Sequence, residues 1–261
     1  MRLATWNING IRARLDFVSL WLKEREPTLV GFQELKSEDD SFPHNFFAEL
    51  GYEVHTHGQK SWNGVAIAVR QDLELKILQR GLPGQESNGA RLITALCGDV
   101  TYTSVYCPNG KNPEHADFQM KLEWFDALGE YWSKLIAEYP ASAIGGDFNI
   151  VPAGRDSWRG KEGDGEMFHT ASERDRLRKF VDLNLHDLFR ELNPGSAQHS
   201  WWDYRGGAFE RSQGLRIDMI YGTPQIRART QAVSIDREYR ERKEDMTPSD
   251  HVPVVADLAD R

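Results

Sequence analysis

The G-G-D-F-N segment at residues 145–149 combines residue types that could perform chemistry at the end of a strand. The apolar run 141–144 before it predicts a short buried strand that ends at two glycines. Side chains two positions apart in extended chain point to the same side, so Asp147 and Asn149 are expected to face one pocket. The carboxylate could act as a base or a metal ligand, and the amide as a donor and an acceptor. The alternative for such a segment is an Asx turn that caps a strand.

Four further segments place similar polar groups at the ends of predicted strands. Asn7 and Glu34 end the first two strands, Asp218 lies in an otherwise apolar run, and Asp250-His251 precedes the last strand. A single acid or histidine in a loop is usually a cap or a solvated side chain, but acids beside buried strands need another explanation. Together these groups form an oxygen-rich site, which suits Mg²⁺, with Mn²⁺ as its substitute, and excludes a zinc site with several histidines.

A scaffold of alternating strands and helices is needed to position these groups. Apolar runs and period-two patterns predict strands at 3–7, 28–32, 64–69, 91–97, 100–106, 141–144, 199–204, 215–221, 233–235 and 251–258. Helical spacing predicts helices at 12–26, at 112–139, at 172–183 and in a short segment that ends at Gly51. Ser172 is expected to cap the last long helix, with Asp175 at its capping-box position. No linker or repeat divides the chain, so we expect one domain, 1–261, of the α+β class, with packed sheets inside and helices outside.

Composition narrows the class of protein further. The chain is 11% aromatic and has eight tryptophans, which indicates a packed globule. The N-terminus reads as a strand and no apolar run approaches the ~20 residues of a membrane helix, so we expect a cytoplasmic protein without membrane contact. Cys97 and Cys107 flank a predicted hairpin that places their sulfurs roughly 20 Å apart, too far for a disulfide.

Seven motifs in order across almost the whole chain resemble the exonuclease III family of apurinic/apyrimidinic endonucleases, within the endonuclease/exonuclease/phosphatase superfamily. The motifs are W-N-I-N-G-I-R, G-F-Q-E-L-K, Y-C-P-N-G, G-G-D-F-N, S-W-W-D-Y-R, G-L-R-I-D and P-S-D-H-V-P-V. The resemblance implies a four-layer α/β sandwich of two mixed sheets flanked by helices. It also implies a Mg²⁺-dependent cut 5′ of abasic sites, 3′-to-5′ exonuclease action on duplex DNA, and 3′-end cleaning.

The same resemblance implies roles for individual residues. Metal binding is implied for Glu34 as the main carboxylate, and for Asn7, Asp250, Asp147 and Asn149. Catalysis is implied for Tyr106, Asp147, Asn149, Asp218 and His251. In this assignment Asp147 orients or deprotonates the attacking water, while His251, held by Asp218, polarises the phosphate. These roles agree with the needs of phosphodiester hydrolysis, which requires an oriented water and neutralised oxygens.

Contacts with DNA are implied for a further set of residues. Phosphate binding is implied for Asn109, Arg91 and Arg216, and Trp201 and Leu215 are implied as walls of a pocket for an extruded abasic sugar. Alternation of side chains along the chain predicts that only one of Trp201 and Trp202 faces outward. The arginines near the predicted pocket favour phosphate contact over a merely solvated face; they are those at 205, 211, 216, 227 and 229.

The expected partner is double-stranded DNA with abasic sites or 3′ ends, bound by a monomer that associates with the nucleoid when it acts. A net charge of −8 argues against nucleic acid when taken alone, although a carboxylate cluster that binds Mg²⁺ contributes to it and local basic patches can still bind phosphates. Two rival functions remain: a phosphodiesterase that acts on a lipid or inositol phosphate, and a catalytically silent relative that binds RNA. The second rival should have lost catalytic groups, and this chain retains them.

Overall fold

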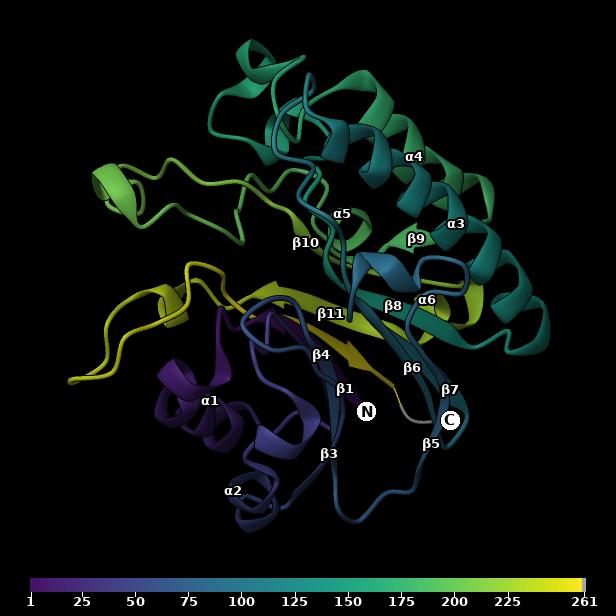
Figure 1. Ribbon diagram of the computed structural model, residues 1–261, viewed down its shortest axis with the longest axis vertical. Coiled ribbons are helices and arrows are strands. Elements are labelled where there is room, and N and C mark those ends of the chain that lie inside the picture. The colour runs from purple at the N-terminus through teal and green to yellow at the C-terminus, as the bar shows by residue number, and fades with distance from the viewer. Residues whose placement is uncertain (260–261) are drawn as a thin grey trace.

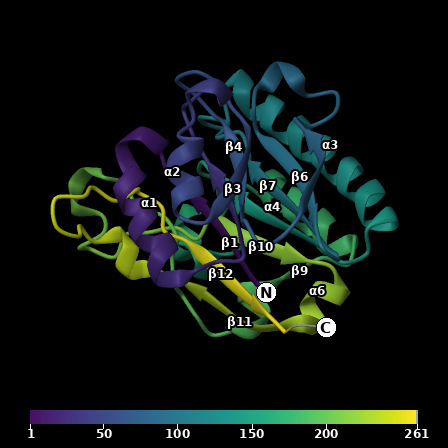
Figure 2. The same cartoon turned by 90° about the horizontal axis from the view of Figure 1, so that it is seen from below.

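The computed structural model describes residues 1–259 and contains two six-stranded mixed sheets that face each other (Figure 1). The first sheet contains β1 (Arg2–Asn7), β2 (Leu29–Gln33), β3 (Tyr52–His57), β4 (Val65–Arg70), β11 (Thr230–Ile235) and β12 (Val254–Leu258), in the spatial order β11-β12-β1-β2-β4-β3. The second contains β5 (Leu75–Arg80), β6 (Leu92–Cys97), β7 (Val100–Tyr106), β8 (Ser142–Asp147), β9 (His186–Asp187) and β10 (Asp218–Gly222), in the order β5-β6-β7-β8-β10-β9. In Figure 2, β1 and β12 lie side by side although they come from opposite ends of the chain.

Helices cover the outer face of each sheet. On the first sheet these are α1 (Ile11–Arg25) and α2 (His44–Glu49), and on the second they are α3 (Ala116–Glu138) and α4 (Ala171–Asp182). The shorter α5 (Leu188–Leu192) and α6 (Pro224–Arg229) pack near β10. Side chains alternate as predicted, since Leu3 of β1 points into the core between the sheets and Trp6 packs beneath α1. The predicted four-layer sandwich of two sheets flanked by helices is confirmed.

Strand direction gathers the polar strand ends at one edge of the sandwich. β1 and β2 are parallel, and Asn7 at the end of β1 pairs with the residue that precedes Glu34. β7 and β8 are also parallel, and Tyr106 pairs with Asp147 at their ends. β10 runs antiparallel to β8, so Asp218 at its start lies opposite Asp147. Residues more than two hundred positions apart along the chain therefore meet at this edge.

The N-terminus of α4 differs from the prediction. The cap is Thr170 instead of Ser172, and Thr170 Oγ1 accepts from the backbone N–H of Glu173 at 3.2 Å. The Glu173 carboxylate accepts from the backbone N–H of Thr170 at 3.0 Å and completes the capping box. The longer glutamate reaches back to the cap, which the shorter Asp175 is less suited to do.

Other predicted boundaries were wrong for physical reasons. α3 begins at Ala116, because the side chain of His115 accepts from the N–H of Asp117 and caps it there. β3 and β5 were missed; both include exposed polar positions, which weaken the apolar pattern. The predicted strand at 199–204 is reduced to isolated bridges at Trp201.

The cysteines and the helices agree with what composition predicts about disulfides and membrane spans. Both cysteines are free and buried, and Cys97 pairs across the hairpin with Val100 as predicted. Within residues 1–259, no helix has both the length and the apolar character to cross a membrane.

Candidate active site

Glu34, Asp147 and His251 meet at the edge where the strand ends converge. Each offers one ligand atom, and these atoms all lie within 4.8 Å of one another. Asn7 joins the two acids, because its Nδ2 donates to Glu34 Oε1 at 2.8 Å and to Asp147 Oδ2 at 3.0 Å. Glu34 has a φ of 54°, a left-handed conformation that turns the chain directly after β2. Asp147 is buried and Glu34 is partly exposed, so the cluster is accessible from the Glu34 side.

The donor set fits a hard divalent cation. The carboxylates of Glu34 and Asp147 supply oxygen ligands beside a single imidazole, a set that suits Mg²⁺ or Mn²⁺ better than structural zinc. Lys36 Nζ lies 3.1 Å from Glu34 Oε2 and offsets part of the negative charge. Glu34 and Asp147 could therefore hold the metal that the resemblance implies.

Asn7 and Asp250, two further predicted metal ligands, accept hydrogen bonds from within the chain, and their role at the metal stays a prediction. Asn7 Oδ1 accepts from the N–H of Asn9 at 3.0 Å, so the amide nitrogen faces the acids. The two oxygens of Asp250 accept from Asn9 Nδ2 at 2.8 Å and from Trp201 Nε1 at 3.0 Å. Asn7 thus orients the acids, and Asp250 holds the tryptophan.

His251 and Asp218 form the predicted pair. The imidazole Nδ1 lies 2.9 Å from Asp218 Oδ2, and Nε2 lies 3.7 Å from Asp147 Oδ2. Burial lowers the pKa of His251, but the carboxylates of Asp218 and Asp147 raise it by more, to about 10. The ring is therefore charged at neutral pH. Ser200 Oγ donates to Asp218 Oδ2 at 2.6 Å and fixes this carboxylate in turn.

Asp147 is the acid best matched to proton transfer. Burial, together with the charges of Asp218 and Glu34, raises the pKa of Asp147 to about 7, although His251 acts in the opposite direction. A carboxylate that titrates near neutral pH can accept a proton from water and release it again. The N–H of Asn149 donates to Asp147 Oδ1 at 2.9 Å and orients the group.

Asn149 and Tyr106 are neighbours of this carboxylate, and Arg91 contacts Tyr106. Asn149 has a φ of 50°, and its Nδ2 donates to the carbonyl of Cys107 at 2.9 Å. Burial and the charges of Glu34 and Asp147 raise the pKa of Tyr106 well above its usual value, so the phenol stays neutral and can donate. Arg91 lies over the Tyr106 ring, 4.9 Å from the centroid, and donates to the Tyr106 carbonyl at 3.2 Å.

Arg216 does not lie where the predicted phosphate contact requires. The residue is fully buried, its Nε donates to Asp156 at 2.6 Å, and its Nη2 donates to Asp187 at 2.8 Å. Both carboxylates are also largely buried, so the guanidinium is held by its own chain and cannot reach DNA. Arg227 and Arg229 are likewise paired with acids, namely Glu191 and Asp99.

Replacing Arg216 with methionine is expected to destabilise the fold instead of weakening DNA binding directly. The substitution leaves the carboxylate of Asp187 without its arginine partner and removes one of the two arginines that bind Asp156, at a cost of about 3–5 kcal/mol. Chemical denaturation measures the loss. The control is Arg205→Met, at a side chain that is 91% exposed, which should change the free energy of unfolding by less than about 0.5 kcal/mol. A fully stable Arg216→Met protein with weakened DNA binding would contradict this account.

The Arg216 network also predicts how stability depends on pH. Burial raises the pKa of Asp156, but the charges and hydrogen bonds of Arg216 and Arg190 lower it by more, so the net shift is downward. A carboxyl whose pKa is lower in the folded state stabilises the protein above the unfolded value of about 3.9, and this stabilisation is lost as the pH falls. The acid loss of stability, measured by chemical denaturation at a series of pH values, should therefore be smaller in Asp156→Asn than in the parent protein. Equal losses in the two proteins would contradict the assignment.

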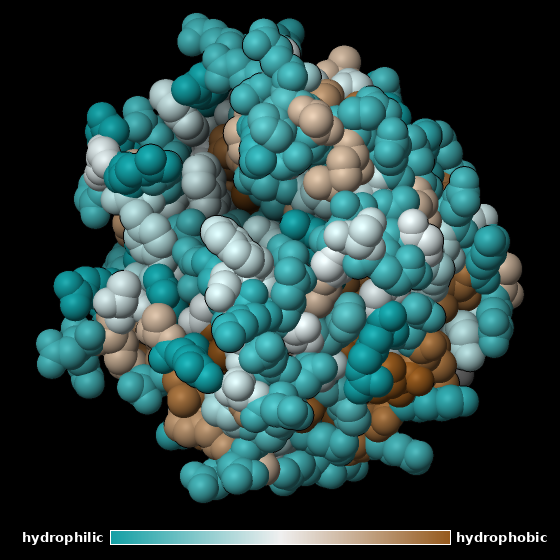
Figure 3. All heavy atoms as spheres, viewed as in Figure 1, coloured by the Kyte–Doolittle hydropathy of each residue, from teal (hydrophilic) through white to brown (hydrophobic). Residues whose placement is uncertain are grey.

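Trp201 and Leu215 line one pocket, as the resemblance implies. The pocket has a volume of about 320 Å³ and lies between the segments 158–169 and 201–215. Figure 3 shows a hollow with hydrophobic residues on its wall on the face that is also viewed in Figure 1. Trp202 is 1% exposed and packs in the core, so only one of the two adjacent tryptophans faces the pocket.

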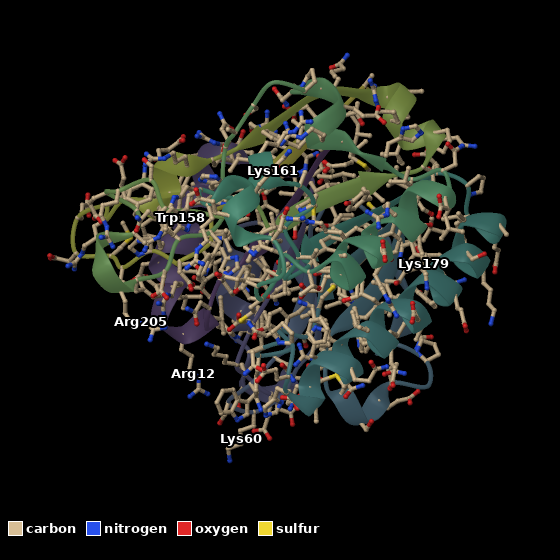
Figure 4. All side chains as sticks on the ribbon, turned by 90° about the horizontal axis from the view of Figure 1, so that it is seen from above. Arg12, Lys60, Trp158, Lys161, Lys179 and Arg205 are labelled. Carbon is tan, nitrogen blue, oxygen red and sulfur yellow. The ribbon has the colours of Figure 1, made fainter. Side chains whose placement is uncertain are left out.

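Cationic and aromatic side chains surround the pocket. Arg159, Arg205 and Arg211 are among its lining residues, together with the exposed ring of Trp158. In Figure 4, Trp158 and Arg205 lie toward one end of the molecule and Lys179 toward the other. The basic groups that could meet a phosphate backbone therefore include residues beside the pocket, although the whole chain is acidic.

Comparison with known proteins decides the family. The model of the Endonuclease/Exonuclease/phosphatase family matches residues 4–251. The chain belongs to this family. An exodeoxyribonuclease III from Haemophilus influenzae is 33% identical, over 99% of this chain and 100% of that protein.

Solved structures of the family agree in fold. A 3′-5′ exonuclease (NExo) from Neisseria meningitidis has a TM-score of 0.94 and 34% identity, over 99% of this chain and 100% of that one. A second structure, a variant of the 3′ phosphatase NExo from Neisseria bound to a product DNA hairpin, has a TM-score of 0.92, 34% identity and 99% coverage of both chains. An AP endonuclease from Archaeoglobus fulgidus has a TM-score of 0.92 and 32% identity, over 99% of both chains. The resemblance to exonuclease III is confirmed, and so is the assignment as an enzyme, a hydrolase of the nuclease kind.

Three positioning residues of this family member were missed at the level of sequence. Ser200 fixes Asp218, Asn9 bonds to Asp250, and Lys36 pairs with Glu34. All three lie inside motifs that were recognised, so proximity to the motif residues was the available signal. Ser200 and Asn9 contact residues that are distant in sequence, and Lys36 contacts Glu34 across a tight turn. The pattern of residue types does not reveal such contacts.

Proposed function

We propose that this protein is a Mg²⁺-dependent DNA repair nuclease. It hydrolyses the phosphodiester 5′ of abasic sites, and it removes nucleotides and blocking groups from 3′ ends of duplex DNA. The proposal rests on the contacts that join the wall of the pocket to the residues assigned to hydrolysis. Trp201 on the pocket wall donates to Asp250, and the next residue, His251, contacts both catalytic carboxylates.

The reaction is assigned to the buried charged groups. The oxygen of a water molecule bonds to phosphorus while the bond from phosphorus to O3′ breaks. Asp147 takes the proton of the water, and the charged ring of His251, held by Asp218, donates through Nε2 to a phosphate oxygen. The O3′ leaves with the electron pair of the broken bond and takes a proton from solvent water to become an alcohol. Mg²⁺ held by Glu34 and Asp147 would neutralise the charge that develops on the phosphate.

Uncharged donors complete the phosphate site. The neutral phenol of Tyr106 and the amides of Asn109 and Asn149 are assigned to the non-bridging oxygens. Arg91 supports this group through its contact with Tyr106. Preorganised donors of this kind stabilise the transition state without having to reorganise during the reaction.

The pocket supports an abasic sugar as the preferred occupant at the cut. Its walls of Trp201 and Leu215 present apolar surface to a deoxyribose that carries no base. A sugar without a base leaves the helix at low cost, because it has no pairing or stacking to lose. The arginines beside the pocket suit the flanking phosphates of duplex DNA. All these residues come from one chain, so we propose that a monomer acts, on DNA in the nucleoid.

A substrate panel tests the proposal. Equal concentrations of a duplex with one abasic analogue, a duplex with a 3′-phosphate, a duplex with recessed 3′ ends, an inositol phosphate and an RNA hairpin are incubated with the full chain and Mg²⁺. Hydrolysis of the DNA substrates alone is expected. Turnover of the inositol phosphate would favour the first rival, and tight RNA binding without any turnover would favour the second.

Trp201→Ala is expected to lose abasic-site incision far more than hydrolysis of a small aryl phosphodiester that needs no pocket. The tryptophan forms the wall of the pocket, and its side chain meets the hydrolytic side only at Asp250 and at the edge of the His251 ring, so its loss should affect docking of the sugar first. Rates on both substrates are compared with those of Trp201→Phe, which keeps an aromatic wall but loses the hydrogen bond to Asp250.

Thermal melting separates this result from simple unfolding. Truncation of a buried large aromatic costs about 3–5 kcal/mol, which would lower the melting temperature. An unchanged melting temperature with selective loss of incision supports the pocket. Equal losses on both substrates together with a lowered melting temperature would contradict it.

A further inference from the structure

Lys121 in α3 lies fully buried among polar partners. An ammonium group has three protons, and each finds an acceptor here. They are Glu173 Oε1 at 2.5 Å, the carbonyl of Asn149 at 2.7 Å and the carbonyl of Asn109 at 3.2 Å. Lysine is almost never fully buried unless it is paired. A role as a solvated surface charge therefore does not explain why a lysine occupies this position.

The acid partner is held equally firmly. Glu173 is fully buried, and its second oxygen accepts from both the backbone N–H of Thr170 at 3.0 Å and the Thr170 hydroxyl at 2.8 Å. These bonds form the capping box of α4. Lys121 is therefore fixed to the start of α4 as well as to its own helix.

The two carbonyls belong to the loops that follow β7 and β8. Asn149 has a left-handed backbone conformation. Its carbonyl accepts from Lys121 Nζ, and its side-chain Nδ2 donates to the carbonyl of Cys107. In the other loop, Gly110 has a φ of 82°, and a Cβ added there would lie 2.8 Å from Lys121 Cδ. The loop with Asn109 thus packs directly on the stem of the lysine, and both loops depend on one buried cation.

We propose that Lys121, fixed by Glu173, is a positioning residue for hydrolysis. It holds the loops after β7 and β8 at a spacing that lets the side chains of Asn109 and Asn149 bind the same phosphate. The inference rests on the proposed function of these two asparagines. A lysine suits the position because its point charge and long stem can serve three acceptors at once, whereas an apolar side chain would leave two carbonyls without their donor.

Small displacements at this position should affect the rate strongly. A shift of about 1 Å in a group that orients the substrate can cost about 10²-fold in rate. The lysine itself does not contact the phosphate, so its loss should reduce kcat while the affinity of the protein for DNA stays nearly the same.

The test is the double variant Lys121→Met/Glu173→Gln. Methionine keeps an unbranched stem against Gly110, and glutamine can still close the capping box, so no buried charge is left unpaired. The expected result is a fall in kcat of about 10²-fold, with an unchanged dissociation constant for the DNA measured without metal. Backbone amide signals of Asn109 and Asn149 in ¹H–¹⁵N NMR spectra should shift as well.

Asp126→Asn provides a matched control. Asp126 also joins α3 to α4, since it pairs with Arg176 at 3.0 Å and with Lys179 at 2.6 Å, and both of these partners lie in α4 and not in the two loops. This variant should keep its kcat and its asparagine signals. A purely structural role for Lys121 would lower the melting temperature of the double variant and leave kcat at low temperature equal to that of the control.

The outcomes separate the inference from the proposed function. If the parent protein cleaves DNA and the double variant matches the control in kcat, the positioning role is overturned. If the parent protein cleaves no DNA, the proposed function fails. The NMR spectra alone then decide whether Lys121 fixes the positions of Asn109 and Asn149. Unchanged asparagine signals in the double variant overturn the inference in either case.

Discussion

Glu34→Gln is expected to abolish nearly all hydrolysis and to weaken Mg²⁺ binding. The substitution keeps the shape of the side chain and its contact with Asn7, but it removes one of the two carboxylate charges of the cluster. A bound metal supplies several kcal/mol of stabilisation to the transition state, so a loss of about 10³-fold in kcat is expected. Isothermal calorimetry gives the Mg²⁺ affinity, and DNA cleavage gives the rate.

Glu38→Gln is the control for this prediction, because Glu38 is exposed and lies four residues further along the chain. It should change neither quantity. The Glu34→Gln protein should fold as the parent does, since the residue is partly exposed and its removal leaves no buried charge unpaired. Unchanged Mg²⁺ affinity in Glu34→Gln would show that Glu34 is not a metal ligand.

The second prediction is that Asp218 and His251 act as one unit. Asp218 holds the ring through Nδ1 and raises its pKa, so either loss removes the charged, oriented imidazole. Each alanine variant should lose about 10²–10⁴-fold in kcat, and the double variant should be little slower than the slower single variant. Rates of the parent, the two single variants and the double variant complete the cycle.

Losses that multiply in the double variant would show that the two residues act independently. Ser200→Ala gives a milder comparison, because it removes the hydrogen bond to Asp218 and leaves the carboxylate and the ring in place. It should lose less activity than Asp218→Ala. A Ser200→Ala protein as slow as Asp218→Ala would mean that the hydroxyl, and not the charge of the acid, decides the orientation of the ring.

Much of the site was predictable because strand ends leave a pattern in sequence. Apolar runs that stop at Asn7, Glu34 and Asp147 identify side chains at the edge of a buried sheet, and parallel pairing places those edges together. Alternation also predicts that only one of Trp201 and Trp202 faces outward, and in the structure it is Trp201. The four-layer arrangement came from the resemblance, since strand patterns alone do not give the order of strands.

What could not be predicted depends on partners that are distant in sequence. Arg216 sits in a motif beside the pocket, and nothing near it in the chain shows that Asp156 and Asp187 enclose it. Asn7 lies beside the metal position as implied, but its orientation is decided by the N–H of Asn9 after the turn. Lys121 looks like one more polar residue of a long helix, and only the packing of α3 on α4 makes it buried.

Cleavage of a labelled duplex with a single abasic analogue, as Mg²⁺ is added back after chelation, tests the central claim most directly. The account predicts no cleavage in the chelator. As Mg²⁺ is restored, it predicts one cut on the 5′ side of the abasic position and gradual shortening from the 3′ ends, with Mn²⁺ able to replace Mg²⁺. Cleavage that persists in the chelator, or an intact duplex at every concentration of either metal with a folded protein, would contradict it.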